Sequence, residues 1–462
     1  MQSLDIKSLQ EFYRKQGGTV RSVIEWVLDR MDRGDPGVWT ARVSAKNLLD
    51  QADHLDATGP TDSPLFGVPY SVKDNIDVSG MKTTAGCPAF QRMAGKDAAV
   101  VSALRKAGAL VVGKNSMDQF ATGLVGIRSD PVPTNPFDPT RIPGGSSSGS
   151  AVAVASGMVT FALASDTGGS GRVPAAINGI VGWKPAPSSV STNGLVYANR
   201  TFDCVPVFAR TVDDALTVVD VLPIKSGLEA ALPCIPEGWM ASGDGGTKVL
   251  AAPDPDSASF LGDKDCREAF SQALTGARTA GFEIRFIEFE ALGHLGEMVF
   301  QSALLVERWN SIGAFVSENR DSVNLAVAQI VADAERWSAS DVFEALYELQ
   351  VRRAAAVDIL AGADALLVPT VPTVPTIADV ELDPIGANHQ MGTYTYFANL
   401  LDLVACAFPA GSRADGAPFG VCLLGPQEAE HMVRVMARQL SGRLASSGKD
   451  RGLDVGVLST QA

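Results

Sequence analysis

Three short stretches of the 462-residue sequence combine residue types that could carry out acyl transfer. Lys73 directly follows the apolar segment PYSV, the loop GGSSSGS occupies residues 144–150, and the turn SDTGGSG occupies residues 165–171. A buried lysine loses its proton more readily and can then act as a base. Ser170 lies in a glycine-rich turn, where consecutive backbone N–H groups can converge on a developing negative charge. The turn around Ser170 is therefore a candidate oxyanion hole for a tetrahedral intermediate.

Each stretch also has an ordinary structural explanation when it is taken alone. Most lysines lie in solvent, and Gly-Ser segments are often flexible linkers. The loop at 144–150, however, runs directly into the apolar segments AVAVA and TFALA, so its backbone is held between buried elements. A helix expected to begin near Val173 would add its positive dipole end to the turn. We therefore interpret the combination as a catalytic site.

The elements that must position these stretches alternate between short apolar strands and helices. GVPYSV predicts a strand, a helix is expected from about 97 to 107 with Gly108 closing it, and ALVVG follows as the next strand. After the serine-rich loop the pattern repeats as AVAVASG (helix), TFALASD (strand) and VPAAING (helix). This alternation predicts the α/β class, with a large, mixed and mostly parallel twisted β-sheet covered by helices on both faces.

The flanking segments are expected to extend this body. Residues 1–60 are typical of amphipathic helices that pack on its outside, with Val20, Val23, Ile24 and Val27 on one helix face. KVLAAP opens a second α/β half, after a Gly- and Pro-rich surface connection at 224–246. A helix near 264–280 and the strand FEIRFIEF are expected next in that half. Long helices follow between about 292 and 360, and Ser338 and Asp341 are expected to cap the last of them. The late strands are ADALLVP and FGVCLLG.

Composition and charge disfavour several classes of protein. The formal charge of −14 disfavours nucleic acids and anionic membrane surfaces as partners, because both are bound through Lys and Arg. The six cysteines form no C-x-x-C pair, so neither a disulfide framework nor a zinc site is indicated, and no cofactor is expected. The first residues are charged throughout, which predicts a cytoplasmic protein. Residues 142–165 lack charge, but 10 of these 24 positions are Gly or Ser, which favours a loop and a buried helix over a membrane span.

Two other motif matches do not fit their context. GSSSG at 145–149 matches G-x-S-x-G and would make Ser147 a nucleophile, but no apolar strand precedes it, and the four histidines (54, 294, 389 and 431) lie in no motif. Residues 108–115 are one residue away from a phosphate-binding P-loop, but the middle of this segment is a predicted strand.

Lys73 in GVPYSVKDNID, Ser146 in GGSSSGSAVAVASG and Ser170 in SDTGGSGRVPAAINGIVGWKP resemble the amidase signature family over nearly the whole chain. The two serines have the family's spacing of 170 − 146 = 24. The resemblance implies the amidase signature fold, with Ser170 as nucleophile, Ser146 as a bridging serine after a cis peptide bond, and Lys73 as base. For Lys73 to accept a proton at neutral pH, burial must lower its pKa.

The same resemblance extends to the turn around the nucleophile and to the domain boundaries. The backbone N–H groups of Thr167, Gly168, Gly169 and Ser170 would hold the oxyanion, and the flanking Asp166 and Arg172 are expected to brace the turn. The boundaries expected are residues 1–60 for the N-terminal helices, 61–445 for the amidase signature domain with its catalytic core at about 67–220, and 446–462 for a C-terminal tail.

Several strings look most like allophanate hydrolases, among them DQFATGLVG at 118–126 and GTYTYFANLLDL at 392–403. Those enzymes cleave N-carboxyurea and release ammonia, so the resemblance implies a small anionic amide as substrate. Arg308 matches the family's substrate-binding arginine, and Gly123 and Ser147 are further substrate-binding candidates; a salt bridge with Glu307 is the alternative role for Arg308. The family's substrate-binding tyrosine is replaced by Phe300, which cannot donate a hydrogen bond.

Other departures leave alternatives open. The segments GIRSDPVPTNP and WKPAPSSVS differ from the family's usual strings, and the chain is expected to lack the C-terminal domain that allophanate hydrolases often carry. Either a separate protein or spontaneous decarboxylation would then finish the reaction sequence. The alternatives are an amidase for other aliphatic or aryl amides, the amidase subunit of an amidotransferase, and a catalytically silent binding subunit. A homodimer is the expected assembly.

Overall fold

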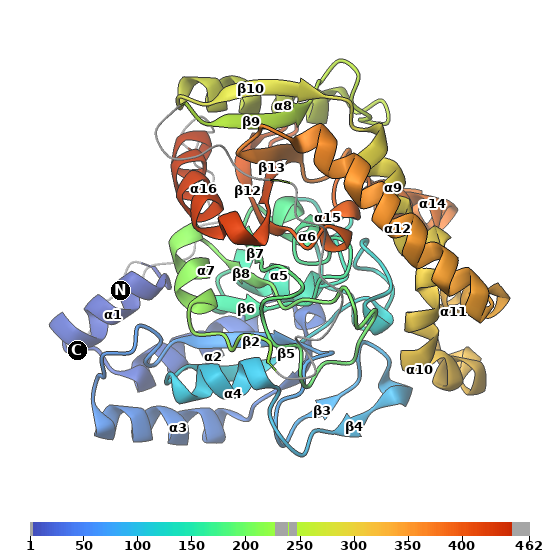
Figure 1. Ribbon diagram of the computed structural model, residues 1–462. Coiled ribbons are helices and arrows are strands. Elements are labelled where there is room, and N and C mark those ends of the chain that lie inside the picture. Colours follow the sequence, from blue (N-terminus) through green and yellow to red (C-terminus); the bar gives the residue numbers. More distant parts are fainter. Residues whose placement is uncertain (1–2, 227–238, 240–246, 446–462) are drawn as a thin grey trace.

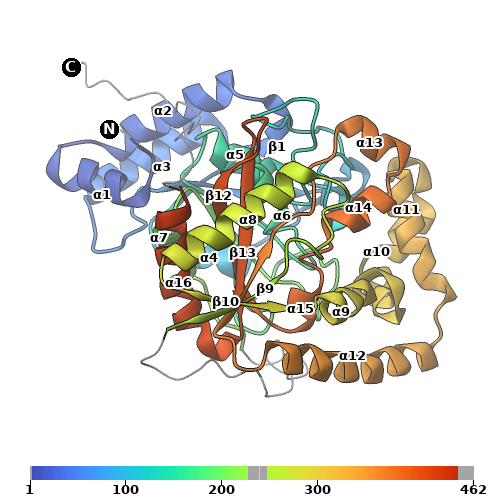
Figure 2. The same ribbon diagram turned by 90° about the horizontal axis from the view of Figure 1, so that it is seen from above.

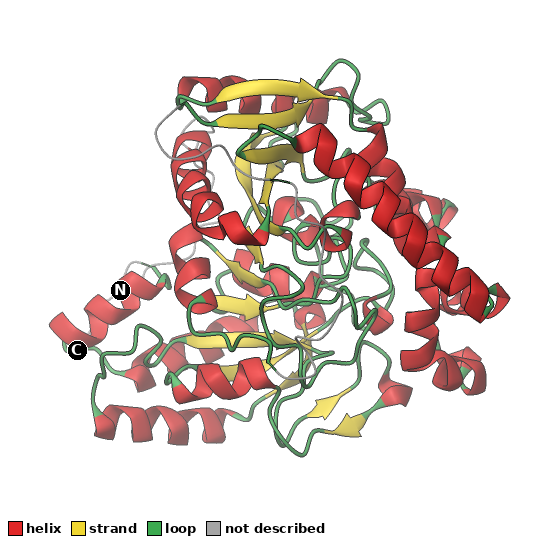
Figure 3. Cartoon of the chain, in the orientation of Figure 1, coloured by secondary structure: helices red, strands yellow, loops and turns green. Residues whose placement is uncertain are grey.

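The computed structural model describes residues 3–226, 239 and 247–445, and the fold is given for these residues. They form one large sheet with helices on both sides and a small two-stranded sheet (Figures 1 and 3). The surface connection expected at 224–246 lies almost entirely outside the described residues, and the expected tail at 446–462 lies wholly outside them.

The large sheet has eleven strands in the order β1-β5-β2-β6-β8-β7-β12-β13-β11-β9-β10. Their bounds are β1 Trp39–Arg42, β2 Pro69–Lys73, β5 Leu110–Asn115, β6 Phe161–Leu163, β7 Val181–Lys184, β8 Val207–Ala209, β9 Val249–Pro253, β10 Glu283–Ile287, β11 Ala365–Pro369, β12 Val404–Ser412 and β13 Pro418–Gly425; β3 Lys82–Thr83 and β4 Arg92–Met93 form the small sheet.

Parallel pairing is confined to two blocks of this sheet. Strands β5, β2 and β6 are parallel, and so are β11, β9 and β10, whereas the other neighbouring strands are antiparallel. Among the described strands, four of ten neighbouring pairs are therefore parallel. The α/β class and the large mixed sheet are confirmed, with fewer parallel pairs than the alternation of strands and helices predicts.

The α-helices lie around this sheet. Their bounds are α1 Ile6–Lys15, α2 Val20–Arg33, α3 Ala45–Thr58, α4 Ala99–Lys106, α5 Ser148–Ala155, α6 Val173–Ile177, α7 Val212–Val219, α8 Lys264–Thr279, α9 Glu290–Gln301, α10 Val306–Glu318, α11 Leu325–Ala332, α12 Ala339–Leu360, α13 Ile377–Leu382, α14 Gly386–Met391, α15 Phe397–Leu400 and α16 Glu430–Ala445. Figure 2 shows α7 and α16 on one side of β12 and β13 and α6 on the other. Helices α9 to α12 form an outer layer along one side of the sheet, on the right in Figure 1.

Local sequence explains where several of these helices begin. Thr19 accepts a hydrogen bond from the Ser22 N–H and caps α2, whose predicted apolar face is buried. Ser338 and Asp341 form the predicted capping box at the start of α12.

Four strands of the large sheet, and both strands of the small one, were not expected from the sequence. Strand β1 is only four residues long and lies in a segment expected to be helical, yet it pairs with β5 and ties residues 39–42 into the sheet. The others in the large sheet are β7, β8 and the long central strand β12, whose buried run VACAFPA has an apolar character throughout and no alternation to mark it as a strand.

The parallel block β5-β2-β6 positions the candidate site. Its strands end at Asn115, Lys73 and Leu163, and the carboxyl ends of parallel strands meet at one edge of a sheet. The segment after β6 leads directly into the turn at 165–171, while α5, which packs on β2 and β6, begins at Ser148, within the serine-rich segment. Residues far apart in the sequence are thereby brought to one place.

Candidate active site

The three catalytic candidates meet in one chain of hydrogen bonds. Lys73, the last residue of β2, donates from Nζ to Ser146 Oγ over 2.8 Å. Ser146 Oγ lies 2.8 Å from Ser170 Oγ. All three side chains are buried. Because a hydroxyl can both donate and accept, this arrangement can carry a proton between Ser170 and Lys73.

Burial controls the ionisation of Lys73. Besides Ser146, its Nζ has only neutral partners in the described structure: Ser165 Oγ at 2.9 Å and Ser165 O at 3.3 Å. Burial lowers the pKa of Lys73 to about 7, against the opposing effect of the carboxylates of Asp118, Asp166 and Asp203. A base with a pKa near neutrality is matched to proton transfer at physiological pH.

The loop before α5 holds Ser146 in place. The Gly145–Ser146 peptide bond is cis, as the resemblance implies, and the Ser146 carbonyl accepts the N–H of Asp118 at 3.1 Å. Ser147 was expected to bind substrate, but its side chain is fully buried and its hydroxyl donates to Ser165 O over 3.2 Å. The Ser147 hydroxyl therefore supports the loop, which corrects the expected role of its side chain.

Asp166 and Arg172 brace the nucleophile turn, by which we mean residues 166–172. Both side chains are fully buried and form two hydrogen bonds to each other at 3.0 Å. Asp166 also accepts the N–H groups of Gly169 and Gly171, each over 2.8 Å. The Gly169 N–H is thus used inside the turn, which corrects its assignment to the oxyanion hole.

Three other N–H groups of this turn remain as candidates for the predicted oxyanion hole. Those of Thr167, Gly168 and Ser170 have no hydrogen-bond acceptor in the part of the chain that the structure describes. The helix expected after the turn is α6, which has only five residues. The free N–H groups of the turn can therefore supply positive potential beside Ser170, to which so short a helix adds little.

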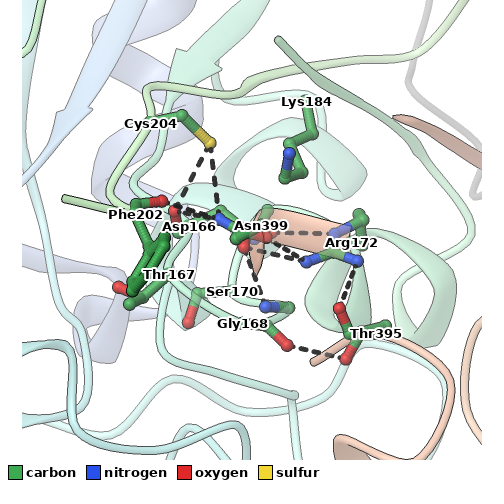
Figure 4. Close-up of polar contacts among 12 residues, drawn as sticks. Asp166, Thr167, Gly168, Ser170, Arg172, Lys184, Phe202, Cys204, Thr395 and Asn399 are labelled. Carbon is green, nitrogen blue, oxygen red and sulfur yellow. Dashed lines mark hydrogen bonds and ion pairs between the residues drawn. The ribbon is translucent and has the colours of Figure 1, made fainter. Parts of the chain in front are cut away.

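A late segment of the chain clamps the nucleophile turn from the other side (Figure 4). Thr395 Oγ1 donates to Gly168 O over 2.8 Å, and its carbonyl accepts from Arg172 Nη1 at 2.8 Å. Asn399 Nδ2 donates to Asp166 O over 2.9 Å, and Asn399 Oδ1 accepts from Arg172 Nη2 at 2.9 Å. The turn is held by polar contacts on both sides.

Arg308, on α10, is a buried cation beside the aromatic residue that departs from the family pattern. Its guanidinium carbon lies 5.3 Å from the ring centroid of Phe300, and its Nη1 donates to Thr122 Oγ1. Glu307 instead accepts the N–H and hydroxyl of Thr201 at 3.1 and 2.9 Å, so the alternative salt bridge between Glu307 and Arg308 is wrong. Arg308 Nε is buried without a hydrogen-bond partner among the described residues. A buried guanidinium with a free donor suits an anionic ligand.

Phe300 and Tyr396 connect Arg308 to the nucleophile turn. The two ring centroids lie 5.2 Å apart. A Cβ atom at Gly168 would lie 2.8 Å from Tyr396 Cδ1, so the Tyr396 ring covers this residue of the turn. The contacting rings of Phe300 and Tyr396 therefore lie between Arg308 and the nucleophile turn.

Gly123 is required by the packing of its own segment. A Cβ atom there would lie 2.6 Å from Asp118 Oδ2. The preceding residue, Thr122, receives the hydrogen bond from Arg308. These contacts place Gly123 beside the candidate substrate site, and its role in binding stays a prediction.

Sequence reasoning missed several polar partners in this site. Ser165, which contacts Lys73, lies in the predicted strand TFALASD next to Asp166 and begins the turn SDTGGSG, so its place beside the turn was a usable signal. Asp203 and Asn399 lie 33 and 229 residues beyond Ser170, and nothing local marks them as neighbours of the turn.

The other motif matches have structural roles or lie elsewhere. Lys114 of the P-loop-like segment is buried and pairs with Asp74 at 3.0 Å. His294 lies largely exposed beside Glu290, and His389 packs on Phe300. Within the described residues, no group of three or more His, Cys, Asp or Glu could hold a metal ion, and no helix is long and apolar enough to cross a membrane. The five described cysteines are free and buried.

Residues 22–433 match the Amidase family, and the chain belongs to this family. The amidase signature fold implied by the sequence is thereby confirmed. The class consists of hydrolases that act on carbon–nitrogen bonds in linear amides.

The chain is similar to several individual members of this family. The chain is 37% identical over 417 residues to urea amidolyase of Saccharomyces cerevisiae, which covers 89% of this chain and 22% of that protein. It is 31% identical over 436 residues to a glutamyl-tRNA(Gln) amidotransferase subunit of Thermus thermophilus, covering 89% of this chain and 91% of the relative. The structure of Kluyveromyces lactis allophanate hydrolase superimposes with a TM-score of 0.88 at 32% identity, over 99% of this chain and 75% of that one. The chain spans about a fifth of the length of the urea amidolyases that it matches.

Proposed function

We propose that the chain is a serine amidohydrolase that cleaves a small carboxylated amide of the allophanate class and releases ammonia. The observation that carries this proposal is the Lys73–Ser146–Ser170 hydrogen-bond chain, with 2.8 Å at each step, in a buried site beside free backbone N–H groups. Allophanate is favoured as substrate because the similar urea amidolyase and allophanate hydrolase are named for urea-derived compounds.

Proton transfer precedes the break of the amide bond. Ser170 Oγ attacks the carbonyl carbon while its proton passes to Ser146, and the Ser146 proton passes to neutral Lys73. The oxyanion is held by the N–H groups of the nucleophile turn, in a site where preorganised dipoles are most effective. Lys73 then returns the proton through Ser146 to the leaving nitrogen, the carbon–nitrogen bond breaks, and ammonia departs from the acyl-enzyme.

Water completes the cycle by the same path. It attacks the acyl carbon and gives its proton through Ser146 to Lys73, which then protonates Ser170 Oγ as the carbon–oxygen bond breaks. The carboxylate of the substrate would bind Arg308, whose planar fork matches two carboxylate oxygens. Phe300 supplies an apolar face and no hydrogen bond at this position.

The test is ammonia release by the purified protein from allophanate, biuret, malonamate and a neutral aliphatic amide, with Ser170→Ala as the blank. Preference for allophanate supports the proposal. Preference for a neutral amide would refute the carboxylated substrate and leave the amidase mechanism in place. Equal ammonia release by wild-type protein and Ser170→Ala would refute the mechanism as well.

A second candidate is the amidase subunit of an amidotransferase. The favouring observation is that the Thermus thermophilus amidotransferase subunit is matched over 91% of its length. Glutamine as ammonia source distinguishes this candidate: ammonia release from glutamine that exceeds release from allophanate would support it.

A further inference from the structure

A tight turn at residues 198–203, here called the 198–203 turn, lies against the nucleophile turn. Asp203 is buried and accepts the N–H groups of Ala198 and Asn199 at 2.8 and 3.2 Å. Its other carboxylate oxygen accepts the hydroxyl of Thr167. Thr167 carries one of the free N–H groups proposed for the oxyanion hole. Asp203 therefore closes the 198–203 turn and at the same time helps to orient Thr167 in the nucleophile turn.

Two residues of the 198–203 turn, Asn199 and Thr201, also bind the segment that carries Arg308. Asn199 Nδ2 donates over 3.1 Å to the carbonyl of Leu304, which lies two residues before the start of α10. Thr201 donates its N–H and its hydroxyl to Glu307, the neighbour of Arg308 on α10. The 198–203 turn thus bridges the nucleophile turn and the helix of the proposed substrate-binding residue.

Asp203 and Arg308 also interact through their charges. The negative charge of Asp203 raises the pKa of Arg308, although burial dominates and lowers this pKa to about 10. Burial raises the pKa of Asp203 itself to about 6, so it is ionised at neutral pH. Its charge reduces the positive potential that Arg308 offers to an anion.

We propose that Asp203 is a positioning residue, which orients the Thr167 peptide in the nucleophile turn and moderates the attraction of Arg308 for an anionic substrate. This inference rests on the proposed function. It assigns Asp203 to no bond-making step, because its contacts are with Thr167 and with backbone groups of its own turn.

Two substitutions separate the two parts of this role. Asp203→Asn keeps the shape and an oxygen for the two N–H donors but removes the charge. Thr167→Val removes only the hydroxyl, and Thr167→Ser restores it. Asp214→Asn is the matched control, because Asp214 is also buried with its pKa raised to about 6, but it binds the Ile6 N–H near the chain's first helix.

The measurements are kcat and KM for allophanate and for a neutral aliphatic amide, the rate of Ser170 labelling by a fluorophosphonate, and Tm. In Asp203→Asn and Thr167→Val we expect kcat and the labelling rate to fall about ten-fold or more, because small displacements of catalytic groups carry penalties of this size. Thr167→Ser should restore both rates. In Asp203→Asn alone, KM for allophanate should fall several-fold while KM for the neutral amide stays unchanged.

Two results would overturn the inference. Labelling rates within two-fold of wild type in both variants would show that Asp203 and Thr167 do not orient the turn. A rise of KM for both amides, with a Tm loss no different from that of Asp214→Asn, would show a structural role only. If wild-type protein hydrolyses neither amide but is labelled, the proposed substrate fails, and the labelling rates still decide this inference.

Discussion

Replacing Lys73 with Met is expected to abolish activity and to stabilise the protein by an amount that depends on pH. Burial lowers the pKa of Lys73 from 10.5 to about 7 in the folded protein. The difference, 10.5 − 7 or about 3.5 pH units, corresponds to about 5 kcal/mol of destabilisation while the lysine is charged in both states. Methionine has a similar length and carries no charge, so it escapes this cost.

The sign of the pH dependence follows from proton binding in the two states. Between pH 7 and 10.5 the unfolded chain keeps the lysine proton and the folded protein does not, so wild-type stability rises with pH. Below pH 7 both states are protonated and the contribution stays at its minimum. The advantage of Lys73→Met is therefore largest near pH 6 and shrinks toward pH 9.

The change is measurable as a difference in Tm. From pH 6 to pH 9 the wild type gains about 3 kcal/mol over the variant, because about two pH units lie above the folded pKa. For 462 residues the unfolding entropy is about 1 kcal/mol per kelvin, so the Tm advantage of Lys73→Met should shrink by about 3 °C. Calorimetric scans of both proteins at pH 6 and pH 9 give this value.

Exposed Lys46 supplies the control, since the Tm difference between Lys46→Met and wild type should not change between these two pH values. In the wild-type enzyme, kcat/KM should rise with pH through about 7, where Lys73 becomes neutral. An equal Tm advantage of Lys73→Met at pH 6 and pH 9 would refute the claim that Lys73 loses its proton near pH 7 in the folded protein.

Three further substitutions test the rest of the site. Arg172→Met leaves Asp166 buried without its cation, so we expect a loss of about 3–5 kcal/mol, measured as a lower Tm together with lost activity. Arg308→Met should lower kcat/KM for allophanate about 30-fold or more and leave a neutral amide within a few-fold; equal losses would make Arg308 structural. Phe300→Tyr adds a hydroxyl beside Arg308 and should lower KM for allophanate by a factor of about 5 or more, as determined by steady-state ammonia release.

The fold was predictable where sequence patterns are local. The run PYSVK ends in a lysine that lies at the end of a buried strand, and GGSSSGS leads into α5 as its apolar continuation predicts. Strand β12 was not predictable in this way, because a strand buried on both faces shows no alternation and cannot be told from a buried helix by periodicity. Strand β1 owes its conformation to its pairing with β5, 71 residues later, counted from Trp39 to Leu110.

The candidate site also contains some residues that local motifs predict and others whose role depends on the surrounding fold. Lys73, Ser146 and Ser170 lie in motifs that resemble the amidase signature family, and this resemblance predicts that they meet. Ser147 and Gly169 lie in the same motifs, yet each donates to a neighbouring acceptor, Ser165 O and Asp166 Oδ1, that a residue pattern does not reveal. A hydrogen-bond donor can serve a substrate only when the fold leaves it free, and this property depends on the complete set of surrounding acceptors.

The division also separates chemistry from specificity within the molecule. The Lys73–Ser146–Ser170 chain is built by the β5-β2-β6 block and the loops that follow it. Arg308 and Phe300 lie on the outer helices, which reach the nucleophile turn through the Tyr396 ring against Gly168. Under the proposed function, we therefore expect substitutions of Arg308 and Phe300 that leave the contacts of the 198–203 turn in place to change the preferred amide more than the proton transfer. Phenylalanine in place of tyrosine at position 300 is consistent with this arrangement, since it alters one side of the aromatic contact and leaves the catalytic hydrogen bonds intact.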